Sequence, residues 1–206
     1  MIKFAVGLGA SAALALMTAG TAHAAACTGV SLGTSSTSDF TLDGADSSAC
    51  VISTVNPDAG PNGDPSGFSP DPFGTGWVLL AKMTSDTSPT FLDGVWYDWS
   101  IAFDSTKNGD WSFGADKSIK LDLVIAMHAA NRSGAFLFDD LTLTANQTKQ
   151  GTWAIHWLNN GGNEPDYSNS SLWVRDVAVV PEPESYALAL AGLAVIGLVA
   201  RRRNTA

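Results

Sequence analysis

The chain has 206 residues, of which 11 are basic and 20 acidic, so its net charge is −9. Four of the basic residues, Lys3 and Arg201 to Arg203, lie at the two ends, and the interior is therefore strongly acidic. Nucleic-acid binding, which needs clustered Lys and Arg, is excluded by this charge, and a wholly disordered chain is excluded by 45% hydrophobic residues with 7 Trp and 9 Phe.

The first 24 residues have the pattern of a secretory signal peptide. Lys3 precedes an uncharged apolar run over residues 4–19, and small residues follow up to Ala24. A cation, an apolar stretch and small residues before the cut are typical of such signals, and we expect a signal helix cleaved after Ala24. The alternative is a retained membrane helix, for which the run falls short of the usual span of about 20 residues.

The next part, to about Thr75, is rich in Ser, Thr, Gly, Asp and Pro, and residues 56–72 contain five prolines and three glycines. We expect it to be loop. Cys27 and Cys50 are the only cysteines, and an oxidising compartment favours a disulfide between them, which contributes about 3 kcal/mol in the chain-entropy model. Two free thiols or a metal pair are the alternative, but no second pair of ligands has suitable spacing.

From Gly76 onward, apolar residues alternate with smaller or polar ones, which predicts strands. The predicted strands cover residues 77–82, 95–103, 119–126, 135–144, 152–157 and 172–179, and 95–103 gives the clearest pattern. Turn signals fall at residues 108–109, 131–134, 149–151 and 159–162. Without amphipathic helices between them, these strands predict an all-β domain over residues 25–180, an antiparallel β-sandwich or jelly roll, with helix confined to the two ends.

Groups that exchange protons near neutral pH are scarce in this domain, which has His128, His156 and Glu164. His156 alternates with Trp153, Ile155 and Trp157 and should point away from them, as a structural or surface residue. His128 follows a strand end, and the sequence names no partner for it. A Gly-x-Ser-x-Gly elbow and a His-Glu-x-x-His zinc pattern are both absent from the sequence, so we expect no catalytic residue and no enzyme.

Acidic residues offer two weaker candidates. Asp139 and Asp140 are adjacent on a predicted strand and should point to opposite faces, so they are not expected to flank one glycosidic bond. The surrounding residues 136–143 resemble a strand of jelly-roll carbohydrate-binding modules that hold a structural calcium. Asp104, Asn108 and Asp110 begin like a calcium loop, but the twelfth position is Ala115 instead of Glu, and a solvated hairpin is favoured over calcium.

The C-terminus combines three elements in order. Pro181, Glu182 and Pro183 come first, then an uncharged run over residues 186–200, and then Arg201, Arg202 and Arg203. The prolines favour an extended, accessible segment. The run reaches about 22 Å as a helix against a hydrocarbon core of about 30 Å, a difference that snorkelling arginines and local thinning cover. Arginines beyond the run place the tail in the cytoplasm and the body outside it.

Residues 181–206 resemble the PEP-CTERM sorting signal of Gram-negative bacteria. This resemblance implies recognition by a membrane exosortase, cleavage near Pro181–Pro183, a transient stay in the inner membrane through a transmembrane helix, and delivery to the cell surface or the extracellular polysaccharide matrix. A plain tail anchor is the alternative, but it needs no Pro-Glu-Pro. Such tails are also named after the C-terminal region of ice-binding proteins, whereas ice binding itself needs flat arrays of Thr, and here only Thr142 and Thr144 alternate.

The sequence therefore predicts an exported, non-enzymatic surface or matrix protein, with contact to glycans as a further expectation. Stacking on sugars would require exposed aromatic side chains such as Trp96, Trp111 or Trp173. The alternative is a secreted hydrolase of polysaccharides, which would require two convergent carboxylates in a cleft.

Overall fold

The architecture is taken from a computed structural model of the chain, which describes residues 24–30, 33–54, 73–84, 89–91, 97–104, 108–181 and 183–203. The predicted signal peptide lies outside the described residues except for Ala24. The proline-rich segment, residues 56–72, also lies outside them.

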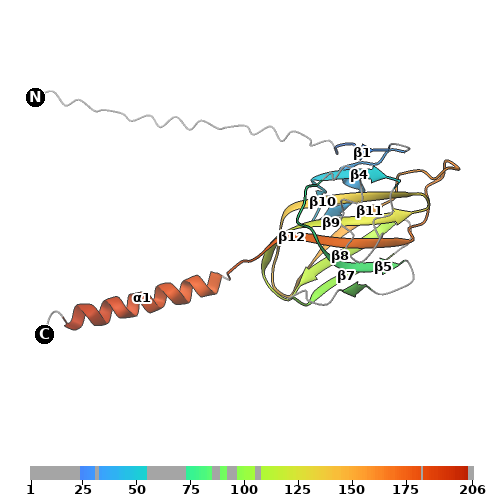
Figure 1. The fold of residues 1–206 in the computed structure, drawn as a ribbon. Coiled ribbons are helices and arrows are strands. Elements are labelled where there is room, and N and C mark those ends of the chain that lie inside the picture. Colours follow the sequence, from blue (N-terminus) through green and yellow to red (C-terminus); the bar gives the residue numbers. More distant parts are fainter. Residues whose placement is uncertain are drawn as a thin grey trace, which may run out of the picture.

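The larger of the sheets has seven strands in the order β1-β4-β10-β9-β12-β5-β6 (Figure 1). Its three long strands, β10, β9 and β12, are neighbours and antiparallel. β1 pairs with β4 in parallel. The bounds are β1 (Thr28–Gly29), β4 (Ala49–Ser53), β5 (Val78–Thr84), β6 (Thr90–Phe91), β9 (Ile119–Ala129), β10 (Arg132–Leu143) and β12 (Asn169–Val179).

Two smaller sheets complete the body. An antiparallel three-stranded sheet has the order β11-β8-β7, and β2 pairs with β3. The bounds are β2 (Thr41–Leu42), β3 (Ala45–Asp46), β7 (Trp99–Phe103), β8 (Asn108–Ala115) and β11 (Gln147–Ala154), with a short 3-10 helix η1 at Thr37–Asp39. These strands confirm the all-β prediction, while the finer jelly-roll prediction stays a prediction.

The main hydrophobic core lies between the seven-stranded and three-stranded sheets and contains buried side chains from both. Phe40, from the N-terminal arm (residues 24–54), packs at 4.5 Å from the ring of Phe136 in β10 and 6.2 Å from that of Trp153 in β11. A second cluster, which includes Phe73, Val124 and Trp173, covers the opposite face of β9 and β12. We call this opposite face the outer face; β9 is thus buried on both sides.

The N-terminal arm corrects the expectation of loop. β4 pairs with β10, and the Thr41 hydroxyl lies 2.8 Å from the Thr152 hydroxyl of β11. The reason is burial, because Phe40, Leu42, Cys50 and Ile52 are all within the core. The structure contains the predicted disulfide between Cys27 and Cys50.

Several predicted turns are strand instead. Residues 149–151 were expected to turn but lie inside β11, where a Cβ on Gly151 would stand 1.9 Å from the Thr41 carbonyl oxygen. Gly134 lies inside β10, where a Cβ would stand 2.7 Å from the Trp157 ring. Both glycines therefore permit close packing, which the sequence does not distinguish from a turn.

Other boundaries also differ from prediction. Asn108 and Gly109, expected to turn, begin β8, and β11 ends at Ala154 instead of continuing to Trp157. Trp157 forms an isolated bridge with Gly33 of the N-terminal arm. The turn at residues 159–162 is confirmed, with the Gly162 N–H donating to the Asn159 carbonyl at 3.0 Å.

A helix, α1 (Pro183–Arg203), projects from the end of β12 away from the sheets (Figure 1). The side chains of residues 183–185, 189, 197–200 and 202–203 are outside the described part. Among the residues described, no helix meets the length and hydropathy needed to cross a membrane.

Candidate functional site

The junction between body and tail lies at the end of β12. Pairing of β12 with β5 ends at Val174 opposite Val78, whereas pairing with β9 continues to Val179 opposite Ile119. The Val180 N–H then donates to the Ser118 carbonyl at 2.8 Å. Beyond Val174, the strand is thus held by one described neighbour, β9.

Proline determines where the pairing stops. Pro181 is exposed and has no N–H to donate, so the ladder cannot extend through it. Pro183 begins α1, a position where its fixed φ suits a helix. Glu182, the middle residue of the predicted motif, lies outside the described residues. The motif therefore begins immediately after the last paired residue of the body.

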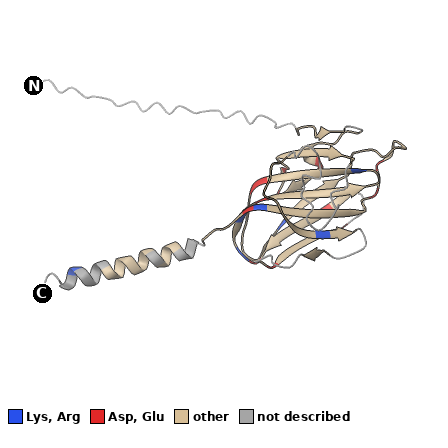
Figure 2. Ribbon diagram, in the orientation of Figure 1, with Lys and Arg blue, Asp and Glu red and all other residues tan. Residues whose placement is uncertain are grey.

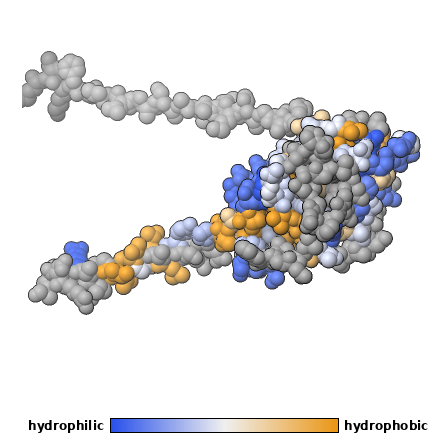
Figure 3. Space-filling view, viewed as in Figure 1, coloured by the Kyte–Doolittle hydropathy of each residue, from blue (hydrophilic) through white to orange (hydrophobic). Residues whose placement is uncertain are grey.

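The apolar side chains of α1 that the structure describes are exposed. Leu188 is 74% exposed, and Leu190, Leu193, Val195 and Ile196 are exposed to a similar degree. Figure 3 shows this hydrophobic surface along α1 and at its junction with the body, where Val177, Val179 and Val180 are also exposed. The blue segment of α1 in Figure 2 lies at the end far from the body, where the helix reaches Arg201. An apolar surface of this extent marks an interaction site.

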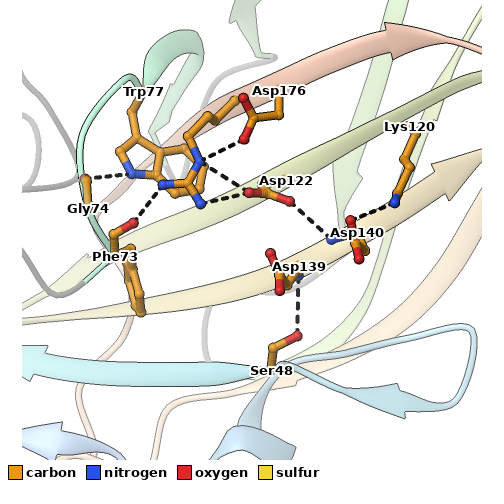
Figure 4. A network of polar contacts seen from close by, with 10 residues as sticks. Ser48, Phe73, Gly74, Trp77, Lys120, Asp122, Asp139, Asp140 and Asp176 are labelled. Carbon is orange, nitrogen blue, oxygen red and sulfur yellow. Dashed lines mark hydrogen bonds and ion pairs between the residues drawn. The ribbon is translucent and has the colours of Figure 1, made fainter.

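A second candidate is a polar network on the outer face, shown in Figure 4. Nε and Nη2 of Arg175 donate to Oδ2 of Asp122 at 3.1 and 2.7 Å, and Nη1 donates to the Phe73 carbonyl at 2.7 Å. The guanidinium also lies 4.3 Å from the ring centre of Trp77. Arg175 thus joins β12, β9 and the segment that precedes β5.

The network includes Asp139 and Asp140, and here the prediction of opposite faces was wrong. A β-bulge sets these two residues of β10 against Asp122 alone, and Asp140 has φ 56°. Lys120 pairs with the Asp140 carboxylate at 2.7 Å, and the Asp140 N–H donates to Oδ1 of Asp122 at 3.0 Å. Because a bulge interrupts the two-residue alternation, both carboxylates reach side chains on the outer face of β9.

The bulge moves the pKa values of two carboxyl groups in opposite directions. A side-chain hydrogen bond with Asp122 and the negative charge of Asp122 both raise the pKa of Asp139. Burial raises the pKa of Asp122, but the Asp140 N–H and Arg175 outweigh it, so that pKa is lowered. Opposite pKa shifts of two neighbouring carboxyl groups occur at acid–base sites and also in structural ion-pair networks such as the one around Arg175. The sequence signal that reasoning from periodicity passed over is Asp122 itself, a charge between Leu121 and Leu123 in a buried strand.

Both histidines have partners that the sequence did not name. Nδ1 of His128 lies 2.8 Å from the hydroxyl of Ser133, which is fully buried, and burial lowers the pKa of His128. Nδ1 of His156 lies 3.0 Å from the buried Asp39 carboxylate. These contacts fix β9 to β10, and the segment after β11 to the N-terminal arm. Because the Ser133 hydroxyl beside His128 is buried, it is poorly placed to attack a polymer.

The weak calcium candidate lies on a small pocket in the three-stranded sheet. Oδ1 of Asp104 accepts the Asp110 N–H at 2.8 Å, and Asn108 begins β8. The pocket, of about 150 Å³, is lined by Ala102, Phe103, Asp104, Asp110, Trp111, Ser112 and Gln150. In the described ranges, no group of three or more His, Cys, Asp or Glu is placed to hold a metal ion.

The aromatic platform considered for sugar stacking is not present at the described positions. Trp111 and Trp173 are each only 1% exposed, so neither offers a face for stacking on a sugar. Trp111 stacks on Phe103 and donates to the Thr41 carbonyl, while Trp173 donates to the Ser171 hydroxyl. Trp96 lies outside the described residues.

Comparison with known proteins gives one match. Residues 179–203 match the PEP-CTERM protein-sorting motif, which covers the end of β12, Pro181 to Pro183 and α1. No curated protein and no solved structure is similar to the chain. The motif indicates that the chain is exported and sorted by an exosortase.

Proposed function

We propose that this chain, which carries the PEP-CTERM motif at residues 179–203, is a non-enzymatic protein of the cell surface or the extracellular polysaccharide matrix. Its β-sheet body is the delivered part, and its tail holds it in the inner membrane until an exosortase removes the tail. The observation that carries the proposal is the junction. Here Pro181 and Glu182 lie between the paired end of β12 and a helix with exposed apolar side chains.

The membrane step is supported by the chemistry of α1. Its uncharged run of 15 residues reaches about 22 Å, and arginine side chains at its end extend toward the headgroups. Hydrocarbon is the partner that this surface fits, because the exposed leucines gain by leaving water. The arginine cluster keeps its end of the helix cytoplasmic, so the body stays on the export side.

The test follows the tagged chain in a host that has an exosortase. Arg201, Arg202 and Arg203 are replaced together by Ala in one variant, and Pro181 and Pro183 by Ala in another. We expect the wild type to be shortened and recovered outside the inner membrane, and both variants to accumulate at full length. Unchanged processing and location in both variants would refute the proposal.

Glycan contact is the finer part of the proposal, and the pocket at Asp104, Asp110 and Gln150 is its best-supported place. Carboxylate and amide groups of this kind bond sugar hydroxyls, and Phe103 contributes an apolar wall. Because the body is acidic, neutral or cationic polysaccharides are the ligand class that fits. Co-sedimentation of the chain with such polymers, and its loss in Asp110→Ala, tests this contact.

A polysaccharide hydrolase is the second candidate, and the Asp122–Asp139 pair is the observation that favours it. Asp139 would donate a proton and Asp122 would act as the base or nucleophile. The pair ranks second because Asp122 is only 6% exposed and is bound by Arg175. The two carboxyl groups also share a hydrogen bond, which brings them closer together than a pair that flanks a glycosidic bond. Release of reducing ends from polysaccharides by the wild type, and its absence in Asp139→Asn, would favour this candidate.

Calcium binding at Asp104, Asn108 and Asp110 remains a prediction of the sequence. A calorimetric titration with millimolar calcium, followed by a melting curve, tests it. An absence of both heat and melting shift would remove it.

A further inference from the structure

Residues 176–180, at the end of β12, are held to the body by backbone pairing on one edge. Their pairs with β9 are Ala178 opposite Lys120 and Val179 opposite Ile119, followed by the Val180–Ser118 hydrogen bond. Pairing with β5 has ended before them, at Val174. All five residues are exposed, so none of their side chains contributes to the core.

The start of this segment is irregular. A bulge sets Asp176 and Val177 against a single residue of β9, and Asp176 has φ 53°. A left-handed backbone at a residue other than glycine is strained, and a bulge is a natural point at which a strand can bend away. The Asp176 carboxylate contacts Arg175 at 3.4 Å, within the same strand.

Removal of the segment would leave β9 in place. The other edge of β9 is paired with β10 over the same stretch, with Leu143 opposite Ile119 and Thr142 opposite Lys120. Ile119 and Leu121 would keep their places in the core. Residues 176–180 are thus a unit that can open locally, with few backbone bonds to lose and no apolar burial.

Space at the junction gives a reason for opening. Two residues, Pro181 and Glu182, separate Val180 from the first residue of α1, a reach of about 7–10 Å when extended. With α1 in the membrane, the motif is confined between the body and the lipid surface. An enzyme that acts there needs extended chain on both sides of the bond, and the chain before the motif is the end of β12.

We propose that residues 176–180 leave β9 and bind the exosortase as an extended strand, together with Pro181–Pro183. This rests on the proposed sorting and adds the body's own strand end to the recognised surface. In the precursor, one edge of residues 176–180 pairs with β9. The exosortase pairs with the same edge through backbone hydrogen bonds, as proteins commonly do when they bind extended peptides.

The experiment locks the strand. Lys120→Cys and Ala178→Cys, directly opposed and both exposed, are combined in the full chain to form a disulfide in the export compartment. Thr84→Cys with Asn169→Cys is the matched bridge, between opposed positions of β5 and β12 at the other end of β12. The two single cysteine variants at 120 and 178 control for the substitutions, and thiol alkylation confirms each bridge.

Processing is followed by immunoblot of the precursor and the shortened product. We expect the lock to slow processing by about tenfold or more, since the opened state is no longer reached, while the matched bridge and the single variants behave as wild type. A Gly-Ser-Gly-Ser insertion between Val180 and Pro181 should restore processing to the locked chain, because it supplies extended residues that need not leave the sheet.

The outcomes separate this inference from the proposed sorting. If the locked chain is processed at the wild-type rate, the strand does not open and the inference is wrong, although sorting stands. If the insertion fails to rescue the locked chain, the effect lies elsewhere in the fold and the inference is equally overturned. If even the wild type is never shortened, it is the proposed sorting that fails.

Discussion

Arg175 and Asp122 join β12 to β9 through two hydrogen bonds to a single carboxylate oxygen, at 3.1 and 2.7 Å. Both side chains are largely withdrawn from water, and the Phe73 carbonyl takes a third donor of the same guanidinium. The pair thus fixes the segment before β5 against the outer face.

Replacement of Arg175 by Met should lower the free energy of unfolding by about 2 kcal/mol, because a mostly buried Asp122 carboxylate loses its charged partner. Lys120→Met is the control, since the Lys120–Asp140 pair is exposed and should contribute much less than the Arg175–Asp122 pair. Denaturant unfolding of the detergent-solubilised chain measures both. An equal loss in the two variants would contradict the structural role given to Arg175.

Replacement of Asp139 by Asn should raise stability at neutral pH. The pKa of Asp139 is raised above 3.8 in the folded chain, so the stabilisation from its proton is present below pH 3.8 and lost as the pH rises through the folded pKa. Asn at position 139 does not titrate, so the variant keeps its stability as the pH rises. Because Asp139 is exposed, we expect a gain of about 0.5 kcal/mol or less.

Melting temperatures at neutral pH and below pH 3.8 test this, with the gain confined to neutral pH. Asp140→Asn serves as the comparison and should be neutral or slightly destabilising, since it removes the pair with Lys120. A lower melting temperature of Asp139→Asn at neutral pH would rule out the repulsion between Asp122 and Asp139.

Replacement of Gly151 by Ala should destabilise the chain by about 2–3 kcal/mol, because the added methyl group meets the Thr41 carbonyl and the Trp111 indole nitrogen. Gly44→Ala is the matched substitution. A Cβ there meets no atom within 4 Å, and its φ of 75° alone predicts a cost of about 1 kcal/mol. Thermal unfolding of the two variants should preserve this order, and a reversed order would refute the close contact.

Replacement of both Cys27 and Cys50 by Ser should cost about 3 kcal/mol, since the bond closes a loop of 23 residues in sequence separation. Denaturant unfolding with and without reductant measures it. The wild type under reductant should match the double variant, which should itself be insensitive to reductant. Equal stability of wild type and variant without reductant would show that the bond contributes nothing.

Replacement of Leu190 and Leu193 by Lys should release the precursor from the membrane. Each Lys near the middle of a membrane helix raises the free energy of insertion by about 3 kcal/mol. Two such substitutions outweigh the favourable insertion of an apolar run of this length. Alkaline extraction of membranes distinguishes peripheral from inserted chain. Thr148→Lys together with Thr152→Lys, on the exposed face of β11, is the control and should leave extraction unchanged.

The tail was predictable because its signals are local. Proline ends the ladder, an uncharged run forms a helix, and arginines follow it, and each effect depends on neighbours in sequence. The family motif covers the same residues. Strands such as β9 and β12 were predictable for the same reason, since two-residue alternation is a property of the chain itself.

The outer-face network was not predictable from periodicity. In a regular strand the adjacent residues Asp139 and Asp140 would point to opposite faces, whereas the bulge opposite Asp122 turns both toward one face. Trp173 points away from the main core and is still buried, because the second cluster covers the outer face of β12 at this position. Gly151 was taken for a turn because the neighbour that requires it, Thr41, lies 110 residues away in the chain.

The disulfide can form only after the chain has left the cytoplasm. Cytoplasmic thiols are kept reduced, so the N-terminal arm that supplies Phe40 to the core lacks its covalent tie until Cys27 and Cys50 reach an oxidising compartment. Before export the arm is the less stable part of the body, which favours a chain that still threads through a translocation pore. The disulfide therefore forms on the side of the membrane to which the body is exported.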